Sequence, residues 1–166
     1  MDANNFYKRV FLIFCMDKEY AVVIVKPEFL DKKDKVLSLV DKLLENDFER
    51  GKEFLIQPRK EQVDKHCGHV KEKYPYVYED YMEAWPKKQC CVMLYYGNNI
   101  VGRLRDAVGC TNPAEAESHT VRAVFSSDSM EVSTRERRAV RNVIHVSDSY
   151  EASFYEKENW LAELGI

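Results

Sequence analysis

A stretch of ten residues near the C-terminal end, Asn142 to Glu151, holds the side chain most suited to chemistry at neutral pH, the imidazole of His145. The apolar pair Val143–Ile144 indicates a short buried strand that delivers this histidine to its exit, and Ser147–Ser149 favours the start of a helix. An imidazole beside a helix N-terminus can be held in one orientation and presented to an anionic substrate. The alternative is a structural histidine that is satisfied at a strand–helix junction.

A lysine takes a comparable place near the other end of the chain. Tyr20–Val25 is a continuous apolar run rich in β-branched residues, which predicts a central strand buried on both faces. Lys26 follows directly, so its side chain is placed at the rim of the sheet, where binding sites are common. Alternatively, this lysine only marks the point where the strand leaves the core.

Metal-ligating residue types occur, but without a complete ligand set. His66 and His69 stand one turn apart in a polar helix predicted over 61–73, yet no third and fourth ligand follows at a recognisable spacing. The five cysteines are odd in number and form no CxxC pair. They indicate free thiols in a reducing compartment, which favours a cytoplasmic protein.

The whole-chain composition restricts the function classes. The chain has 166 residues, of which 45% are hydrophobic and 32% are charged, as expected for one soluble globular domain. Its net charge of -3 argues against a protein built mainly to coat nucleic acid, so phosphate binding would require a local basic pocket. The apolar run at residues 10–16 is too short to span a bilayer and is interpreted as an extra strand or a packing arm.

The elements that must position these residues alternate between strand and helix. Apolar runs predict strands over 20–25, 48–57, 90–96 and 143–144, and helical spacing predicts helices over 34–46, 61–73, 77–85, 100–108 and from Tyr150 onward. This order favours an α+β fold, a ferredoxin-like split βαβ sandwich with a four-stranded antiparallel sheet covered by helices. A doubly wound parallel sheet is the alternative, although no GxGxxG or P-loop motif supports it.

Arginines lie on several of these elements. Arg105 falls on the polar side of the 100–108 helix, and 121–125 alternates as a strand does, which separates Arg122 from its apolar neighbours. Residues 133–136 match a capping box that opens an arginine-rich helix over 135–141. That helix could bind nucleic acid, but a solvated helix face is the simpler interpretation for an acidic chain.

The ten-residue stretch resembles the signature of nucleoside diphosphate kinases, Asn-x-x-His-Gly/Ala-Ser-Asp-Ser/Ala-x-Glu. Three further segments are similar to that family: Ile24–Pro27, Gly109–Ala114 and Thr120–Arg122. The resemblance extends roughly from Tyr20 to Trp160. It divides the chain into an N-terminal extension, residues 1–19, and a kinase-like domain, residues 20–166.

The resemblance implies a ping-pong reaction, in which a histidine takes the γ-phosphate of a nucleoside triphosphate and passes it to a nucleoside diphosphate. By position, His145 would be the phosphorylated nucleophile, a role that suits a neutral imidazole at pH 7. Glu156 would orient that imidazole, with Ser147 as its partner. Lys26, Arg105 and Arg122 would surround the transferring phosphate and neutralise its developing charge.

The other positions that the resemblance assigns would bind the rest of the nucleotide. Thr111 would hydrogen-bond a phosphate, and Asp148 would hold a water bound to Mg²⁺. Asn142 and Lys26 would bind the ribose hydroxyls, and Tyr76 or Tyr74 would be the aromatic platform for the base. The implied partners are nucleoside tri- and diphosphates and further copies of the chain, in a hexamer or tetramer built from a common dimer. Neither a membrane nor nucleic acid is implied.

The chain departs from the family pattern at several positions. Cys67 replaces a tyrosine near the lysine and the phosphate, so a hydroxyl donor is lost. Val146 replaces a small residue after the histidine, and its β-branched side chain could crowd His145. These changes support the alternative of a catalytically weak or inactive member that serves as a nucleotide-binding or protein-interaction module.

An insertion of about ten residues precedes the signature and is placed at 126–137. In the family, this connection closes over the nucleotide base. We expect the arginine-rich insertion to border the nucleotide site and to change base preference or affinity.

Overall fold

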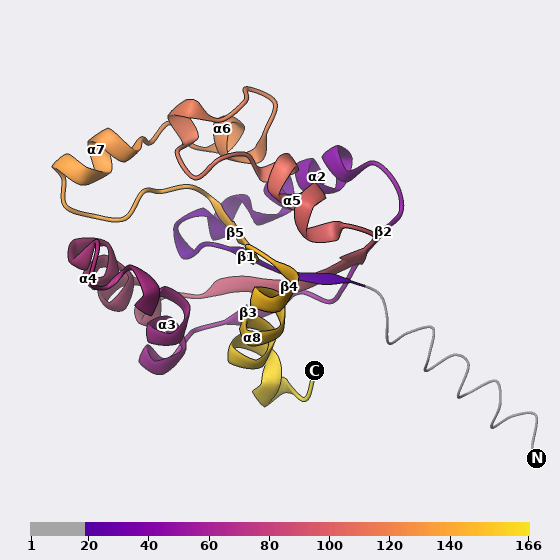
Figure 1. Ribbon diagram of the computed structural model, residues 1–166, viewed down its shortest axis with the longest axis horizontal. Coiled ribbons are helices and arrows are strands. Elements are labelled where there is room, and N and C mark those ends of the chain that lie inside the picture. Colours follow the sequence, from indigo (N-terminus) through magenta and orange to yellow (C-terminus); the bar gives the residue numbers. More distant parts are fainter. Residues whose placement is uncertain (1–18) are drawn as a thin grey trace, which may run out of the picture.

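The computed structural model describes residues 19–166, which are built around one antiparallel sheet (Figure 1). The strands are β1 (Tyr20–Val25), β2 (Phe48–Arg50), β3 (Phe54–Ile56), β4 (Cys90–Gly97) and β5 (Ile144–Val146). Their order is β2–β4–β1–β5, and β3 pairs with the same edge of β4 that β2 occupies. The sheet is therefore four strands wide, which confirms the ferredoxin-like arrangement and excludes a doubly wound parallel sheet.

The strand predicted over 48–57 is interrupted. Three residues, 51–53, span a place where β4 offers only two, Met93 and Leu94, so the edge strand bulges. Gly51 donates its N–H to the Leu94 carbonyl at 2.8 Å, and a Cβ on Gly51 would lie 3.1 Å from the same oxygen. This close approach favours glycine and divides the predicted strand into β2 and β3.

The helices pack on both faces of the sheet. They are α2 (Lys33–Leu44), α3 (Lys60–Cys67), α4 (Pro75–Ala84), α5 (Ile100–Val108), α6 (Val121–Phe125), α7 (Met130–Arg135) and α8 (Tyr150–Leu161). Short 3-10 turns occupy Pro27–Lys32, Gly68–Val70, Trp85–Lys87, Pro113–Glu115 and Ala162–Leu164. In Figure 1, α2, α5 and α6 lie on one side of the sheet, and α3, α4 and α8 lie on the other.

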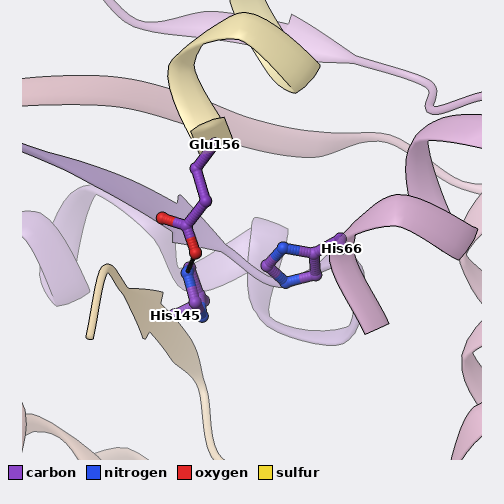
Figure 2. Close-up of side chains that lie close together, drawn as sticks. All are labelled: His66, His145 and Glu156. Carbon is purple, nitrogen blue, oxygen red and sulfur yellow. Dashed lines mark hydrogen bonds and ion pairs between the residues drawn. The ribbon is translucent and has the colours of Figure 1, made fainter. Parts of the chain in front are cut away.

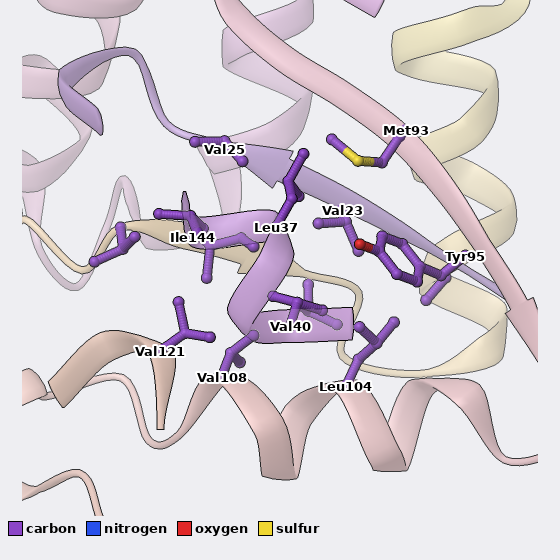
Figure 3. Packing of buried hydrophobic residues seen from close by; sticks show 14 of the residues in the cluster. Val23, Val25, Leu37, Val40, Met93, Tyr95, Leu104, Val108, Val121 and Ile144 are labelled. Atoms are coloured by element: carbon purple, nitrogen blue, oxygen red, sulfur yellow. The ribbon is translucent and has the colours of Figure 1, made fainter. Parts of the chain in front are cut away.

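Alternation along β1 divides the core in two. Val23 and Val25 pack with α2 and α5, whereas Val22 and Ile24 pack with α3 and α8. All four side chains are fully buried, which confirms the prediction of a central strand with two covered faces. Figure 3 shows the first core, where side chains of α2, α5 and β5 meet those of β1.

Two predicted elements around the insertion are wrong. Val121–Phe125 forms helix α6 and not a strand, because alternation over five residues also fits a short helix with Val121 in the core. No helix covers the predicted range 135–141. The helix here is α7, which begins at Met130 after the N-cap Ser129 and ends at Arg135. Arg137 has a φ of 52°, which a continuing helix does not allow.

Two expectations concern the N-terminus and membranes. The apolar run at 10–16, interpreted as a strand or packing arm, lies outside the described residues. Within residues 19–166, no helix combines the length and the apolar character needed to cross a membrane.

Candidate active site

A cavity of about 1590 Å³ collects side chains from distant parts of the sequence. They come from α3, α4, α5, α6, α7, β5, α8 and the residue that follows β1. The predicted site residues that line it are Lys26, Tyr76, Arg105, Thr111, Arg122, Asn142, His145, Asp148 and Glu156. The remaining predicted residue, Ser147, is fully buried and hydrogen-bonded to Glu156. The fold therefore brings all the predicted residues to one place.

His145 lies at the centre of β5, opposite Ile24 of β1. Its Nε2 is 2.8 Å from Glu156 Oε1 of α8, the interaction drawn in Figure 2. The Ser147 hydroxyl donates to the other carboxylate oxygen at 2.5 Å and accepts the backbone N–H of Val22 at 2.9 Å. A carboxylate partner requires the proton on Nε2, so the lone pair of the neutral ring is on Nδ1.

Local sequence explains how Glu156 reaches this histidine. Ser149 is the N-cap of α8, and its hydroxyl accepts the backbone N–H of Ala152 at 3.1 Å. The predicted helix start is thereby confirmed. Because the chain turns directly from β5 into α8, Glu156 returns over His145 within two helical turns.

His66 forms the wall beside His145, a placement that the sequence did not predict. The two rings meet edge to face with centroids 4.5 Å apart, and His66 stacks on Trp85 at 5.6 Å. Burial, followed by the charges of His145 and Lys26, lowers the pKa of His66 well below 6.5. This imidazole is therefore neutral at pH 7. No sequence spacing could reveal the pair, because the two residues come from α3 and β5.

His66, His145 and Glu156 are also a potential metal-binding group, because one ligand atom from each lies within 4.8 Å of the others (Figure 2). His69, the partner suggested by sequence spacing, lines the cavity but is not a member of this group. An ion held here would compete with the hydrogen bond between His145 and Glu156.

Arg122 of α6 is held in place by backbone carbonyls from other segments of the cavity wall. Its guanidinium donates to the carbonyls of Gly109 at 2.6 Å, Ile144 at 2.9 Å and Asn142 at 3.2 Å. Gly109 has a φ of 84°, and a Cβ on it would lie 2.4 Å from the Thr120 hydroxyl oxygen. Position 109 therefore requires glycine. Burial lowers the pKa of Arg122 to about 10, which keeps the side chain charged at pH 7.

Lys26 and Arg105 are held differently. Lys26 is only 4% exposed, and its Nζ donates to the Tyr81 hydroxyl at 3.0 Å. Arg105 pairs with Asp148 at the exposed mouth of the cavity, where such an ion pair contributes little to stability. Among the residues that the structure describes, no carboxylate forms an ion pair with Lys26. Lys26, Arg105 and Arg122 thus bring three positive charges to the wall of one cavity in an acidic chain.

The insertion borders the same cavity. Met130, Ser133 and Thr134 of the inserted segment line it, facing the α4 side that carries Tyr76. The Tyr76 hydroxyl contacts Thr134 Oγ1 at 3.5 Å, and the Arg137 guanidinium lies 5.6 Å from the centre of the Tyr76 ring.

Two of the four arginines in 135–141, Arg138 and Arg141, form bidentate ion pairs, whereas Arg135 and Arg137 are exposed; the solvated-face interpretation is therefore corrected for Arg138 and Arg141. Arg138 donates to both carboxylate oxygens of Asp128, at 2.6 and 3.0 Å, and this contact lowers the pKa of Asp128 to about 2. Arg141 donates to both oxygens of Asp80 on α4, at 2.8 and 3.1 Å. The Arg141 ion pair therefore ties the segment after the insertion to α4, and the Arg138 ion pair ties that same segment to Asp128 of the insertion.

Asn142 offers a buried acceptor to a ligand. Its Nδ2 donates to the Thr111 carbonyl at 3.0 Å. Its Oδ1 is buried and has no hydrogen-bond partner within residues 19–166. A buried acceptor without a partner is uncommon, and a ligand hydroxyl would satisfy it.

The two departures at Cys67 and Val146 have different consequences. Cys67 donates its thiol to the Val63 carbonyl at 3.0 Å, and burial raises its pKa to about 11, so it is a neutral core thiol. Val146 is opposite Val23 in the register and belongs to the core shared with α2 and α5. Strand alternation directs it away from the face that His145 occupies, so its side chain does not crowd the imidazole.

Comparisons with known proteins agree with this geometry. The sequence model of the family described as nucleoside diphosphate kinase matches residues 19–166. A nucleoside diphosphate kinase of Methanocaldococcus jannaschii is 29% identical over 140 residues, which cover 82% of this chain and 88% of that protein. A nucleoside diphosphate kinase of Streptococcus uberis is 32% identical over 112 residues, covering 66% of this chain and 72% of that protein.

Solved structures show the same fold. A nucleoside-diphosphate kinase from Borrelia burgdorferi, described as a transition state mimic with bound vanadate and ADP, has a TM-score of 0.78 at 19% identity. That match covers 87% of this chain and 88% of the other. An NDP kinase from Pyrobaculum aerophilum has a TM-score of 0.74 at 20% identity, covering 87% and 96%.

Proposed function

The chain belongs to the nucleoside diphosphate kinase family, and from that premise we propose that it transfers the γ-phosphate of a nucleoside triphosphate to a nucleoside diphosphate through a phosphohistidine at His145. The Nδ1 lone pair attacks the γ-phosphorus, the bond from that phosphorus to the bridging oxygen breaks, and the first diphosphate leaves. A terminal β-phosphate oxygen of the second diphosphate then attacks the phosphohistidine. The phosphorus–nitrogen bond breaks, and the free imidazole is restored.

The observation that carries this proposal is the chain of hydrogen bonds from His145 through Glu156 to Ser147. It fixes the ring, selects the tautomer with its lone pair on Nδ1, and places a carboxylate beside the positive charge that the ring gains during transfer. A neutral imidazole needs no base to activate it. The arrangement therefore suits a nucleophile better than a structural histidine.

The cationic residues have a common role in this mechanism. Lys26, Arg105 and Arg122 bind the phosphates and stabilise the charge that develops on the transferring group. Arg105 exchanges its exposed partner Asp148 for a phosphate oxygen when the nucleotide binds. Thr111 donates its hydroxyl to a phosphate.

Asp148 fits a role near a magnesium ion, since it is an exposed carboxylate on the cavity and Mg²⁺ prefers oxygen ligands and retains waters. We assign it to a water of an ion carried by the nucleotide. When bound, that Mg²⁺ would neutralise phosphate charge.

The nucleoside occupies the part of the cavity between α4 and the insertion. Asn142 Oδ1 and Lys26 bind ribose hydroxyls, and the base stacks on Tyr76. The inserted residues Thr134 and Arg137 border that base and alter base preference or affinity, a role that their contacts with Tyr76 support. A cytoplasmic location and a homo-oligomer built from a dimer remain predictions from the family.

Cys67 favours a second candidate function, because no hydroxyl occupies the position where the family has a tyrosine. In that case the chain binds nucleotides without turning them over and serves as a binding or interaction module.

Phosphoenzyme formation separates the two functions. The full chain is incubated with γ-labelled ATP and Mg²⁺, quenched, and examined for acid-labile, alkali-stable label. We expect label on the wild type, its discharge by GDP, and none on His145→Ala. A wild type that binds ATP but takes no label would overturn the kinase proposal and establish the binding module.

A further inference from the structure

The loss of the family's tyrosine at Cys67 leaves open what positions the Lys26 ammonium. Lys26 is almost fully buried, and its backbone is anchored by a hydrogen bond from its N–H to the Val143 carbonyl at 3.0 Å. Its long side chain still has several rotatable bonds, which have to be restricted if Nζ is to meet a phosphate in one place. The neutral thiol of Cys67 is bonded to its own helix and does not supply that restraint.

A hydroxyl from another helix reaches the ammonium instead. Tyr81 of α4 accepts a hydrogen bond from Lys26 Nζ at 3.0 Å, and Nζ lies 5.2 Å from the centre of the same ring. Within residues 19–166, this hydroxyl is the side-chain group that is hydrogen-bonded to Nζ. The Tyr81 hydroxyl therefore restrains the ammonium group of Lys26 directly.

The Tyr81 ring is itself held by the aromatic cluster behind His145. It meets Trp85 edge to face at 5.1 Å, and Trp85 is buried and stacks on His66. His66 in turn contacts His145. One rigid set of rings thus positions both the nucleophile and the hydroxyl that contacts Lys26.

We propose that Tyr81 is the positioning residue for Lys26 and supplies, from α4, the hydroxyl that position 67 has lost. The inference rests on the proposed kinase function. Tyr81 acts through Lys26: its oxygen directs the ammonium toward the phosphates, while its own proton remains free to contact a phosphate oxygen or water.

The test compares rates of phosphoenzyme formation for Tyr81→Phe and the wild type at saturating and limiting ATP. The variant keeps the ring and removes one hydrogen bond to a charged group, so we expect the rate to fall about tenfold. Tyr78→Phe is the matched control. Tyr78 is on the same helix, its hydroxyl donates to Asp64 at 2.7 Å, and it does not line the cavity, so its rate should be unchanged.

A second comparison separates positioning from a general structural effect. In a Lys26→Gln background, adding Tyr81→Phe should change the rate less than twofold, because the group it positions is gone. Thermal unfolding midpoints of Tyr81→Phe and Tyr78→Phe should agree within a few degrees.

The outcomes distinguish the two proposals. Equal labelling of the wild type and Tyr81→Phe, or a full tenfold loss in the Lys26→Gln background as well, would overturn the role of Tyr81 and leave the kinase function standing. A wild type without label would overturn the kinase function, and with it any role for Tyr81 in transfer.

Discussion

Two parts of the cavity are built differently. At the transfer end, which consists of His145, Glu156, Ser147 and Arg122, the hydrogen bonds are 2.5 to 3.3 Å long and run to backbone groups or to α8. At the base end, which consists of Tyr76, Thr134 and Arg137, the hydrogen bond is 3.5 Å long and the ring contact is 5.6 Å. Under the proposed mechanism, the side chains are fixed where charge develops and more loosely held where the base is recognised, which is the arrangement that electrostatic preorganisation favours.

The largest expected effect is on the transfer end. Arg122→Ala removes a charge and takes the guanidinium donor from the carbonyls of Gly109 and Ile144, while the Asn142 carbonyl keeps the Ile144 N–H. We expect it to slow phosphoenzyme formation about 10²- to 10³-fold and to lower the free energy of unfolding by about 3 kcal/mol. Urea unfolding and label transfer measure the two effects.

Arg105→Ala is the matched control for that prediction. It should also slow transfer, but it should change the free energy of unfolding by no more than about 0.5 kcal/mol, because its ion pair is exposed. Equal destabilisation by both variants would show that Arg122 is not the structural member of the pair.

A smaller effect concerns pH and His66. The folded-state pKa of His66 lies below its unfolded value near 6.5, so the unfolded chain binds the proton more readily as the pH falls through 6.5. The stability that neutral His66 provides is complete above pH 6.5 and decreases below it. Between pH 7.5 and 5.5, we expect the wild type to lose about 1.4 kcal/mol more than His66→Gln in urea unfolding.

If His66→Gln and the wild type lose the same free energy of unfolding, the rigid wall beside His145 does not depend on a neutral His66, and the contrast between the two ends of the cavity weakens.

The smallest effect is expected at the base end. Arg137→Ala releases the face of Tyr76 from an exposed cation–π contact of about 0.5–1 kcal/mol, so the KM for nucleotides should fall about threefold while kcat is unchanged. Steady-state kinetics with several nucleotides measure this. Arg135→Ala, an exposed change two residues earlier, should have no effect. A rise in KM for Arg137→Ala would mean that the guanidinium itself binds the nucleotide.

The sequence predicted the strands correctly where the apolar run was long, and it failed where the segment was only a few residues long. β1 and β4 follow continuous apolar runs, which are typical of strands buried on both faces. The five residues of α6 fit either a strand or a helix by alternation alone. The start of α7 is set by the N-cap Ser129. The capping box predicted at 133–136 opens no helix, because the positive φ of Arg137 prevents one from continuing there.

The candidate site shows the same division. The signature around His145 and the Lys-Pro after β1 could be found because each is a local pattern. His66 and Tyr81 could not, since their positions depend on how α3 and α4 pack around Trp85. Only tertiary structure brings those rings to His145 and Lys26.

The hydroxyl of Ser147 has a consequence for how the protein is made. It joins the backbone of Val22 to a residue 125 positions later in the chain, and it anchors the carboxylate of Glu156 only after α8 has emerged. A chain synthesised from its N-terminus contains Lys26 early but has neither the histidine nor its anchor until β5 and α8 have left the ribosome. The proposed nucleophile is therefore oriented late, and chains that stop before α8 contain no oriented histidine that could take up phosphate.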